Sequence, residues 1–255
     1  MSNPFAARRA AFRALHAQGC FAMPNPWDVG SAKRLEKLGF KALASTSAGA
    51  AWTMGKTDGQ LTRDEVNAHL HELCAATELP VNADFENGFA DTAEGVGESV
   101  RLAIDTGVAG LSIEDWSGSA IYELPVAVER LKAARAAIDA SGQDVILVGR
   151  AEGYLRGMRD LGAILERLAA YAEAGADCLY APAVVDPDEI RAVVQAVAPK
   201  PVNILLWGPD MSVESLGRLG VRRVSTGGAL AAAAWAAFDK AAKSLAEEGR
   251  MPPRG

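Results

Sequence analysis

The sequence repeats one junction four times: a helical segment stops at a glycine, and a short apolar segment follows at once. The glycines are Gly39, Gly107, Gly175 and Gly220. Glycine is favoured there because the residue just past a helix often takes a left-handed backbone, which other residues resist. The first two intervals are 68 residues long (107−39 and 175−107), and the third is 45 (220−175). Each interval can hold a helix, one further strand and another helix, so the pattern predicts alternating strands and helices.

Eight short apolar segments fit this alternation. The predicted strands are 20–24, 41–46, 80–84, 110–114, 145–150, 178–182, 201–206 and 223–226. Strands that are apolar on both faces are typical of a parallel sheet covered by helices, and eight β-α units in 255 residues indicate a (β/α)₈ TIM-type barrel. The alternative is an open doubly wound sheet, but no Gly-x-Gly-x-x-Gly follows the first predicted strand. Since the composition shows no break, we expect a single domain over residues 1–255.

The last helical segment, 229–245, differs from an ordinary outer helix of a barrel. Its first part, from Gly228 to Phe238, is apolar nearly all the way round, whereas an outer helix normally shows one polar face. Either extra chain buries this helix, or it packs on another subunit. The segment after it is short and polar, so we favour a subunit contact and expect a homodimer or homotetramer.

Charge and cysteine content restrict the partners. The net charge is −6, and lysine and arginine form no run, so nucleic acid and anionic membrane surfaces are poor partners. There is no apolar stretch of transmembrane length. The three cysteines are scattered and odd in number, which fits a reducing compartment without a disulfide framework. We therefore expect a cytoplasmic protein that binds a small molecule.

Two acids follow the third predicted strand. Asp84 and Glu86 stand one residue apart, so on an extended strand they leave on the same side, and Gly88 then allows a sharp turn. Two carboxylates that face the same way repel each other unless a cation lies between them. Mg²⁺ suits this position because it prefers oxygen ligands and tolerates waters between itself and the protein. Taken alone, the stretch could equally be a turn decorated with acids.

Further polar residues end the neighbouring predicted strands, at the edge where barrels of this class carry their active sites. They are Ser45, Thr46 and Ser47, with the small residues Ala48 and Gly49, at the end of the second strand, Asp58 in the loop beyond, Glu114 and Asp115 at the end of the fourth, Arg150 at the end of the fifth and Asn203 on the seventh. Helix N-caps explain isolated acids such as Asp28 and Asp186, but not acids gathered at one end of successive strands. A metal shell beside Arg150 would suit a small dianionic acid, because the guanidinium can fork onto a carboxylate or a phosphonate.

The chain resembles the isocitrate lyase / phosphoenolpyruvate mutase superfamily from about residue 22 to residue 237. The matching motifs are Asp28 followed by Ser31-Ala32, Gly39-Phe40-Lys41-Ala42, Gly55-x-x-Asp58, Val81-x-x-Asp84-x-Glu86-x-Gly88-Phe89, Gly107-x-x-Gly110-x-x-Ile113-Glu114-Asp115 and Arg150-x-Glu152. The resemblance implies a barrel whose last helix is exchanged between subunits of a dimer, usually within a tetramer. It also implies Mg²⁺, which Mn²⁺ could replace.

The resemblance also assigns roles to the strand-end residues. Asp84 would hold the metal directly, with Asp58, Glu86 and Glu114 in its shell. A second set would bind the substrate: Thr46, Ser47 and Ala48 would hold its carboxylate, and Arg150 would bind its other end. From its place on the seventh strand, we also expect Asn203 to bind the substrate. Arg150, Glu114 and Asp58 would be the catalytic residues. The family often has Asp where this chain has Glu86, and Ser-Gly where it has Thr46-Ser47.

The loop after the fourth strand departs most from the superfamily. Lyases that cleave isocitrate or methylisocitrate carry a Lys-x-Cys-Gly-His type segment there, whose cysteine acts as the acid. Here residues 116–124 contain no Cys, His or Lys, so we predict that this chain is neither of those lyases. The polar and aromatic side chains of the loop, the expected gate over the substrate, are Trp116, Ser117, Ser119 and Tyr122.

The sequence thus predicts a Mg²⁺-dependent lyase that cleaves a C–C bond next to the carbonyl of a small α-oxo dicarboxylic acid such as oxaloacetate. The reaction would pass through a metal-bound pyruvate enolate, since a metal stabilises an enolate and carbon dioxide leaves without an acid. Two alternatives remain at this point. One is C–P chemistry on phosphonopyruvate, as a mutase or hydrolase, and the other is a catalytically silent barrel that binds a metabolite.

Overall fold

A computed structural model describes residues 4–208 and 210–251 of the chain. Its eight strands all fall within the predicted ranges. They are β1 (Phe21–Met23), β2 (Leu43–Ala44), β3 (Val81–Asp84), β4 (Gly110–Glu114), β5 (Ile146–Arg150), β6 (Cys178–Tyr180), β7 (Val202–Leu205) and β8 (Arg223–Ser225). The expected domain runs over residues 1–255, of which 1–3, 209 and 252–255 lie outside the described residues.

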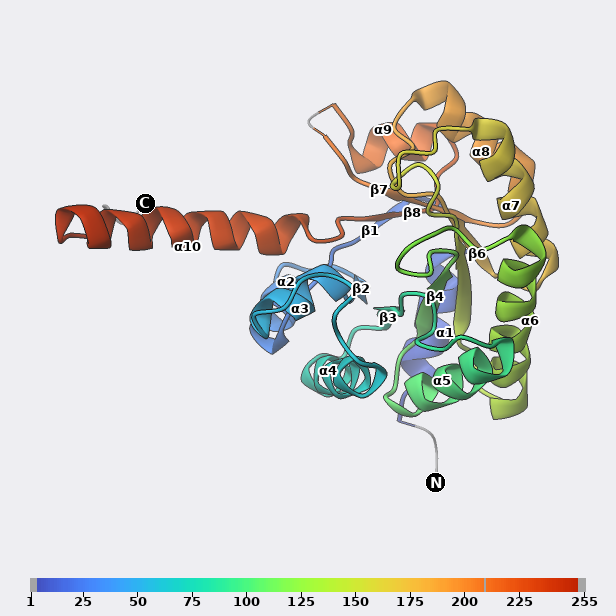
Figure 1. Ribbon diagram of the computed structural model, residues 1–255, viewed down its shortest axis with the longest axis horizontal. Helices are drawn as coiled ribbons and strands as arrows, with labels where there is room; N and C mark the ends of the chain where they lie inside the picture. Colours follow the sequence, from blue (N-terminus) through green and yellow to red (C-terminus); the bar gives the residue numbers. More distant parts are fainter. Residues whose placement is uncertain (1–3, 209, 252–255) are drawn as a thin grey trace.

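The strands form one parallel sheet that curls into a nearly closed barrel (Figure 1). Neighbours pair in the order β1-β8-β7-β6-β5-β4-β3-β2, and every pairing is parallel. At the remaining seam, the N–H of Ala44 on β2 donates to the carbonyl of Pro24, just after β1, over 3.1 Å. The predicted (β/α)₈ architecture is confirmed.

Helices lie between the strands along the chain, and most of them cover the outside of the barrel (Figure 1). They are α1 (Ala6–Leu15), α2 (Val29–Lys37), α3 (Ser47–Thr53), α4 (Arg63–Ala76), α5 (Ala93–Asp105), α6 (Leu124–Ser141), α7 (Leu161–Glu173), α8 (Pro187–Val197), α9 (Val213–Arg218) and α10 (Ala229–Glu248). Asp28 and Asp186 cap α2 and α8 by accepting N–H groups of the first turn, as predicted. The repeated glycine is left-handed as expected, with φ +88° at Gly39 and +100° at Gly107.

The helix α1 closes the amino-terminal end of the barrel. Phe12 is fully buried among inward-facing strand residues such as Met23 and Ile146. One turn earlier in the helix, Arg9 donates to the backbone carbonyls of Val108 (2.9 Å) and Ile104 (2.9 Å). Among the described residues, α1 thus blocks this end, whereas barrels of this class carry their active sites at the carboxyl ends of the strands.

The helix α10 projects away from the barrel (Figure 1). Ala231 is its one buried residue among those described, whereas Trp235, Phe238 and Leu245 are 37%, 61% and 51% exposed. Such a row of exposed apolar side chains is unusual for a helix of a monomer. A subunit contact on α10 stays a prediction. In the part of the chain that the structure describes, no helix is both long and apolar enough to cross a membrane.

Candidate active site

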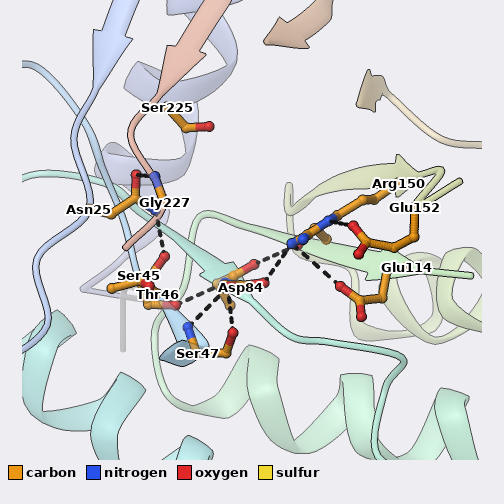
Figure 2. Close-up of polar contacts among 12 residues, drawn as sticks. Asn25, Ser45, Thr46, Ser47, Asp84, Glu114, Arg150, Glu152, Ser225 and Gly227 are labelled. Atoms are coloured by element: carbon orange, nitrogen blue, oxygen red, sulfur yellow. Dashed lines mark hydrogen bonds and ion pairs between the residues drawn. The ribbon is translucent and has the colours of Figure 1, made fainter. Parts of the chain in front are cut away.

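Arg150 is the centre of the polar cluster at the carboxyl ends of the strands (Figure 2). Its Nη1 lies 3.1 Å from Oδ1 of Asp84 and 3.4 Å from Oε2 of Glu114. Its Nε donates to Oε1 of Glu152 over 2.5 Å. Asp84, Glu114 and Arg150 are the last residues of β3, β4 and β5, and Glu114 and Arg150 are register partners. The parallel sheet therefore brings these strand-end charges together, as the sequence predicts.

The segment after β2 holds Asp84 in place. The N–H and the hydroxyl of Ser47 both donate to Oδ2 of Asp84, each over 3.0 Å, while the N–H of Asp84 donates to Oγ of Ser45 over 2.8 Å (Figure 2). Thr46 uses its hydroxyl oxygen to cap α3 by accepting the N–H of Gly49. In the predicted carboxylate-binding set, the side chains of Thr46 and Ser47 thus already have partners within the protein. The N–H of Ala48 lies in the first turn of α3, where it has no intrahelical acceptor.

Two cavities adjoin this cluster and share Ser47, Asp58 and Arg150 in their walls. The first has a volume of about 270 Å³ and reaches from Thr46, Ala48 and Asp84 down to Asn203 and Arg223 inside the barrel. The second, of about 440 Å³, is lined by Glu86, Glu114, Trp116 and Ser117 among others. The structure thus brings all the predicted metal and substrate residues to one continuous region.

Glu86 reaches this region by a route that the sequence did not predict. The strand β3 ends at Asp84, and Glu86 adopts a left-handed backbone with φ +45°, which is uncommon for a residue with a side chain. The carbonyl of Glu86 accepts the N–H of Glu114 over 2.9 Å, which ties the turn to β4. The expectation that strand alternation directs both acids the same way is therefore wrong, although both side chains do line the site.

The carboxylates of the site are poorly neutralised. Burial raises the pKa of Glu86 to about 8, helped by the charges of Asp84 and Asp58, and Oε1 of Glu86 is buried without a hydrogen-bond partner. Burial and the charge of Asp84 also raise the pKa of Asp58. Burial raises the pKa of Glu114 as well, against the opposing charge of Arg150. In this cluster each carboxylate disfavours ionisation of its neighbours, and a cation bound among them would stabilise their ionised forms.

The donor set fits a hard divalent cation held largely through water. Within residues 4–208 and 210–251, no group of three or more His, Cys, Asp or Glu side chains is arranged to hold a metal ion. Mg²⁺ is usually bound by one or two carboxylates and keeps several waters. Asp84 and Glu86 supply carboxylate oxygens with lone pairs to spare, so they could serve as such ligands with Asp58 and Glu114 bonding the waters.

Three residues to which the sequence assigned no role belong to the same cluster. Glu152 is fully buried and pairs with Arg156 (3.0 Å) as well as with Arg150. Tyr180, on β6, places its ring 5.2 Å from the Arg150 guanidinium. The Arg150-x-Glu152 motif of the family resemblance was a signal for Glu152. Arg156 and Tyr180 carried no comparable signal.

The loop after β4 is folded on itself beside the second cavity. Trp116 lies over the guanidinium of Arg156, with 4.4 Å from Cζ to the ring centre, and Ser117 bonds within the loop to Ser119. Tyr122 instead stacks on Arg130 at 4.3 Å. Among the four predicted gate residues, Trp116 and Ser117 line the second cavity, whereas Ser119 and Tyr122 line neither.

Known proteins resemble this chain along most of its length. The family model for phosphoenolpyruvate phosphomutase matches residues 12–246. A solved structure from Burkholderia cenocepacia J2315, assigned only as a lyase/mutase, is 47% identical, with a TM-score of 0.94 and coverage of 98% of this chain and 92% of the other. The oxaloacetate decarboxylase of Rhodopseudomonas palustris (strain BisB18) is 29% identical over 91% of this chain and 83% of its own. The 2-methylisocitrate lyase of Escherichia coli (strain K12) is 31% identical over 68% and 61%. The chain therefore belongs to the phosphoenolpyruvate phosphomutase family, within the isocitrate lyase / phosphoenolpyruvate mutase superfamily.

Proposed function

We propose that this protein is a Mg²⁺-dependent lyase that cleaves the C–C bond next to the carbonyl of a small α-oxo dicarboxylic acid, of which oxaloacetate is the simplest. The observation that carries the proposal is Arg150, held between Asp84 and Glu114 at the wall that the two cavities share. The resemblance to an oxaloacetate decarboxylase over 91% of this chain supports the same chemistry.

Superfamily enzymes typically use Mg²⁺, and in this chain Asp84 would hold it, with Asp58, Glu86 and Glu114 bonding its waters. When bound, the cation would polarise the substrate carbonyl and stabilise negative charge that develops on its oxygen. Mn²⁺ has the same preference for oxygen ligands and would substitute for it.

The protein's own groups would bind and orient the substrate. Arg150 would donate hydrogen bonds to a substrate oxygen, and the free N–H of Ala48 would meet the carboxylate next to the carbonyl. Trp116, on the loop beside the second cavity, would exclude water from the reacting carbon. Carbon dioxide can then leave without a proton donor, so a loop that lacks the catalytic cysteine suffices.

The same loop argues against two other activities of the superfamily. Residues 116–124 offer no cysteine, histidine or lysine, so the loop lacks the cysteine acid that lyases of isocitrate or methylisocitrate use to protonate the leaving succinate. We therefore propose that the chain is neither an isocitrate lyase nor a methylisocitrate lyase, although its 31% identity to a 2-methylisocitrate lyase records a common fold.

Pyruvate release would test the proposal. The purified protein is given oxaloacetate, phosphonopyruvate or methylisocitrate, with and without Mg²⁺, against an enzyme-free blank with the same Mg²⁺. We expect turnover of oxaloacetate that requires Mg²⁺, is lost in Asp84→Ala and is kept in Asp91→Ala, which removes an exposed acid on the loop after β3. Turnover of phosphonopyruvate alone would move the protein to C–P chemistry, and turnover of none would favour a metabolite-binding barrel.

We also propose that α10 is a subunit contact of a homodimer or homotetramer. The exposed Trp235 and Phe238 stack edge to face, with 5.7 Å between ring centres, and with Trp52 of α3 the helix borders an apolar groove. Sedimentation of the whole chain would give its mass, and Phe238→Asp should shift that mass towards the monomer. An unchanged mass would refute a contact through this face.

A further inference from the structure

Arg223 forms part of the floor of the first cavity. It is the first residue of β8 and is 2% exposed. Register partners lead to it stepwise around the barrel: Arg150 pairs with Tyr180, Tyr180 with Asn203, and Asn203 with Arg223. All four residues line the same cavity of about 270 Å³. The cavity therefore has one guanidinium at its mouth and a second one inside the barrel.

The neighbours of Arg223 are neutral. Its Nε donates to Oδ1 of Asn203 (3.0 Å), its Nη1 donates to Oδ1 of Asn82 (3.3 Å), and Nη1 also lies 3.4 Å from Nε2 of His16. Burial lowers the pKa of Arg223, and the titratable groups that act on it are Cys178 and Tyr180. Within the described part of the chain, these partners of Arg223 include no carboxylate.

Other buried arginines show how unusual this is. Arg9 and Arg130 donate to two and three backbone carbonyls, respectively. Arg150 lies among three carboxylates, so an incoming anion would meet their repulsion. Burying a charge without a counter-ion is costly, and Arg223 faces a cavity that can admit one. The need for an anion is therefore greater at Arg223 than at Arg150.

We propose that Arg223 binds the second carboxylate of the substrate, with the hydroxyl of Ser225 beside it. Ser225 lies two residues along β8, lines the same cavity and accepts the amide N–H of Asn203 over 3.1 Å. The inference rests on the proposed function and deepens it. The α-oxo carboxylate end of the substrate lies at the strand-end acids, and its far carboxylate lies inside the barrel. Arg223, rather than Arg150 as the resemblance implied, then binds the far carboxylate.

This arrangement makes Arg223 a determinant of specificity. A site with a buried charged donor discriminates against ligands that leave the donor unpaired. Dicarboxylates are therefore preferred to monocarboxylates of the same α-oxo or α-hydroxy type, and a ligand with an apolar far end is rejected.

The test compares two ligands that share their near end. Malate and lactate are both α-hydroxy acids, and only malate has a far carboxylate. Their dissociation constants are measured by calorimetry with saturating Mg²⁺ on wild type, Arg223→Met and Arg9→Met. The last variant also removes a buried guanidinium, but one that does not line the cavity. We expect wild type and Arg9→Met to favour malate by about tenfold or more, the effect of a charge-assisted hydrogen bond, and Arg223→Met to lose that preference.

An unchanged preference in Arg223→Met, or no preference in wild type, would overturn the proposal. If Arg223→Met does not fold, a crystal structure of the wild-type protein with Mg²⁺ and malate decides: a carboxylate within hydrogen-bond distance of Arg223 supports the proposal, and a carboxylate elsewhere refutes it. Neither readout needs turnover. If wild type prefers malate in an Arg223-dependent way but does not turn over oxaloacetate, the lyase proposal alone is refuted. If wild type turns over oxaloacetate and Arg223→Met keeps the preference for malate, the Arg223 subsite alone is refuted.

Discussion

Glu152 is the side chain whose replacement should disturb this site most without touching a proposed metal ligand. It is fully buried and pairs with Nε of Arg150 at 2.5 Å and with Nη2 of Arg156 at 3.0 Å. Its N–H also donates to Oδ1 of Asp115 over 2.8 Å, so the backbone is fixed independently of the side chain. Glu152→Gln keeps the shape and one carbonyl oxygen but removes the negative charge.

The expected loss of stability follows from these contacts. Removing one partner of a buried ion pair typically costs about 3–5 kcal/mol, because a buried charge is left uncompensated. Two features reduce the cost here: glutamine can still accept the hydrogen bond of Arg150, and Arg150 keeps Asp84 and Glu114 as partners. We therefore expect the free energy of unfolding to fall by about 2 kcal/mol, below the full value for a broken buried pair.

Urea unfolding at neutral pH measures this loss, with Glu214→Gln as the matched control. Glu214 pairs with Arg218 at 2.6 Å, but the two side chains are 83% and 65% exposed, and surface pairs contribute little. Oxaloacetate turnover by Glu152→Gln should also fall at least about tenfold, since Arg150 loses the anchor that orients it. If Glu152→Gln is no less stable than Glu214→Gln, the reasoning about the buried pair is wrong.

Two further perturbations test the barrel itself. Burial and the charge of Arg223 lower the pKa of His16 to about 3. Between this value and the ordinary histidine pKa of about 6.5, His16 is therefore protonated in the unfolded state but not in the folded state. The free energy of unfolding should therefore decline as the pH falls from about 6.5 towards 3, and His16 alone should account for about 2 kcal/mol of the loss at pH 5. His16→Gln should show a correspondingly weaker decline in acid unfolding. If the stabilities of wild type and His16→Gln fall equally with pH, this reasoning is wrong. Gly107 has φ +100°, and a Cβ there would lie 2.5 Å from the Phe5 ring, whereas Gly39 has φ +88° and open space. Thermal unfolding should show Gly107→Ala to be less stable than Gly39→Ala by about 1–3 kcal/mol, the cost of overpacking, and equal losses would exclude a role for the ring.

The fold was predictable because its signals are local. A left-handed glycine such as Gly39 ends a helix by a preference of its own backbone, and the apolar strand that follows is read from adjacent residues. The same holds for Asp84 and Glu114, since a strand end fixes the edge of a parallel sheet on which a side chain lies. The alternation of faces even separates Glu114, at the site, from Asp115, which accepts from the Tyr171 hydroxyl over 2.6 Å.

Partners across the barrel were not predictable in this way. Which side chain Ser47 meets depends on how β2 and β3 are staggered, and the structure directs both of its donors to Asp84. The turn at Glu86 depends on a left-handed residue that its side chain disfavours. Tyr122 faces Arg130 because α6 offers a guanidinium to its ring. Each of these choices is made by tertiary contacts between residues far apart in the sequence.

The distribution of charge in the first cavity gives the proposed substrate a direction. Acids gather at its mouth around Asp84, and a guanidinium without an acid lies at its floor, at Arg223. An anion can bind at the mouth only when a cation offsets those acids, whereas the floor needs none. Omission of Mg²⁺ should therefore abolish binding of lactate, while malate keeps a residual affinity that disappears in Arg223→Met. Equal loss of both ligands without Mg²⁺ would mean that the metal end alone controls binding.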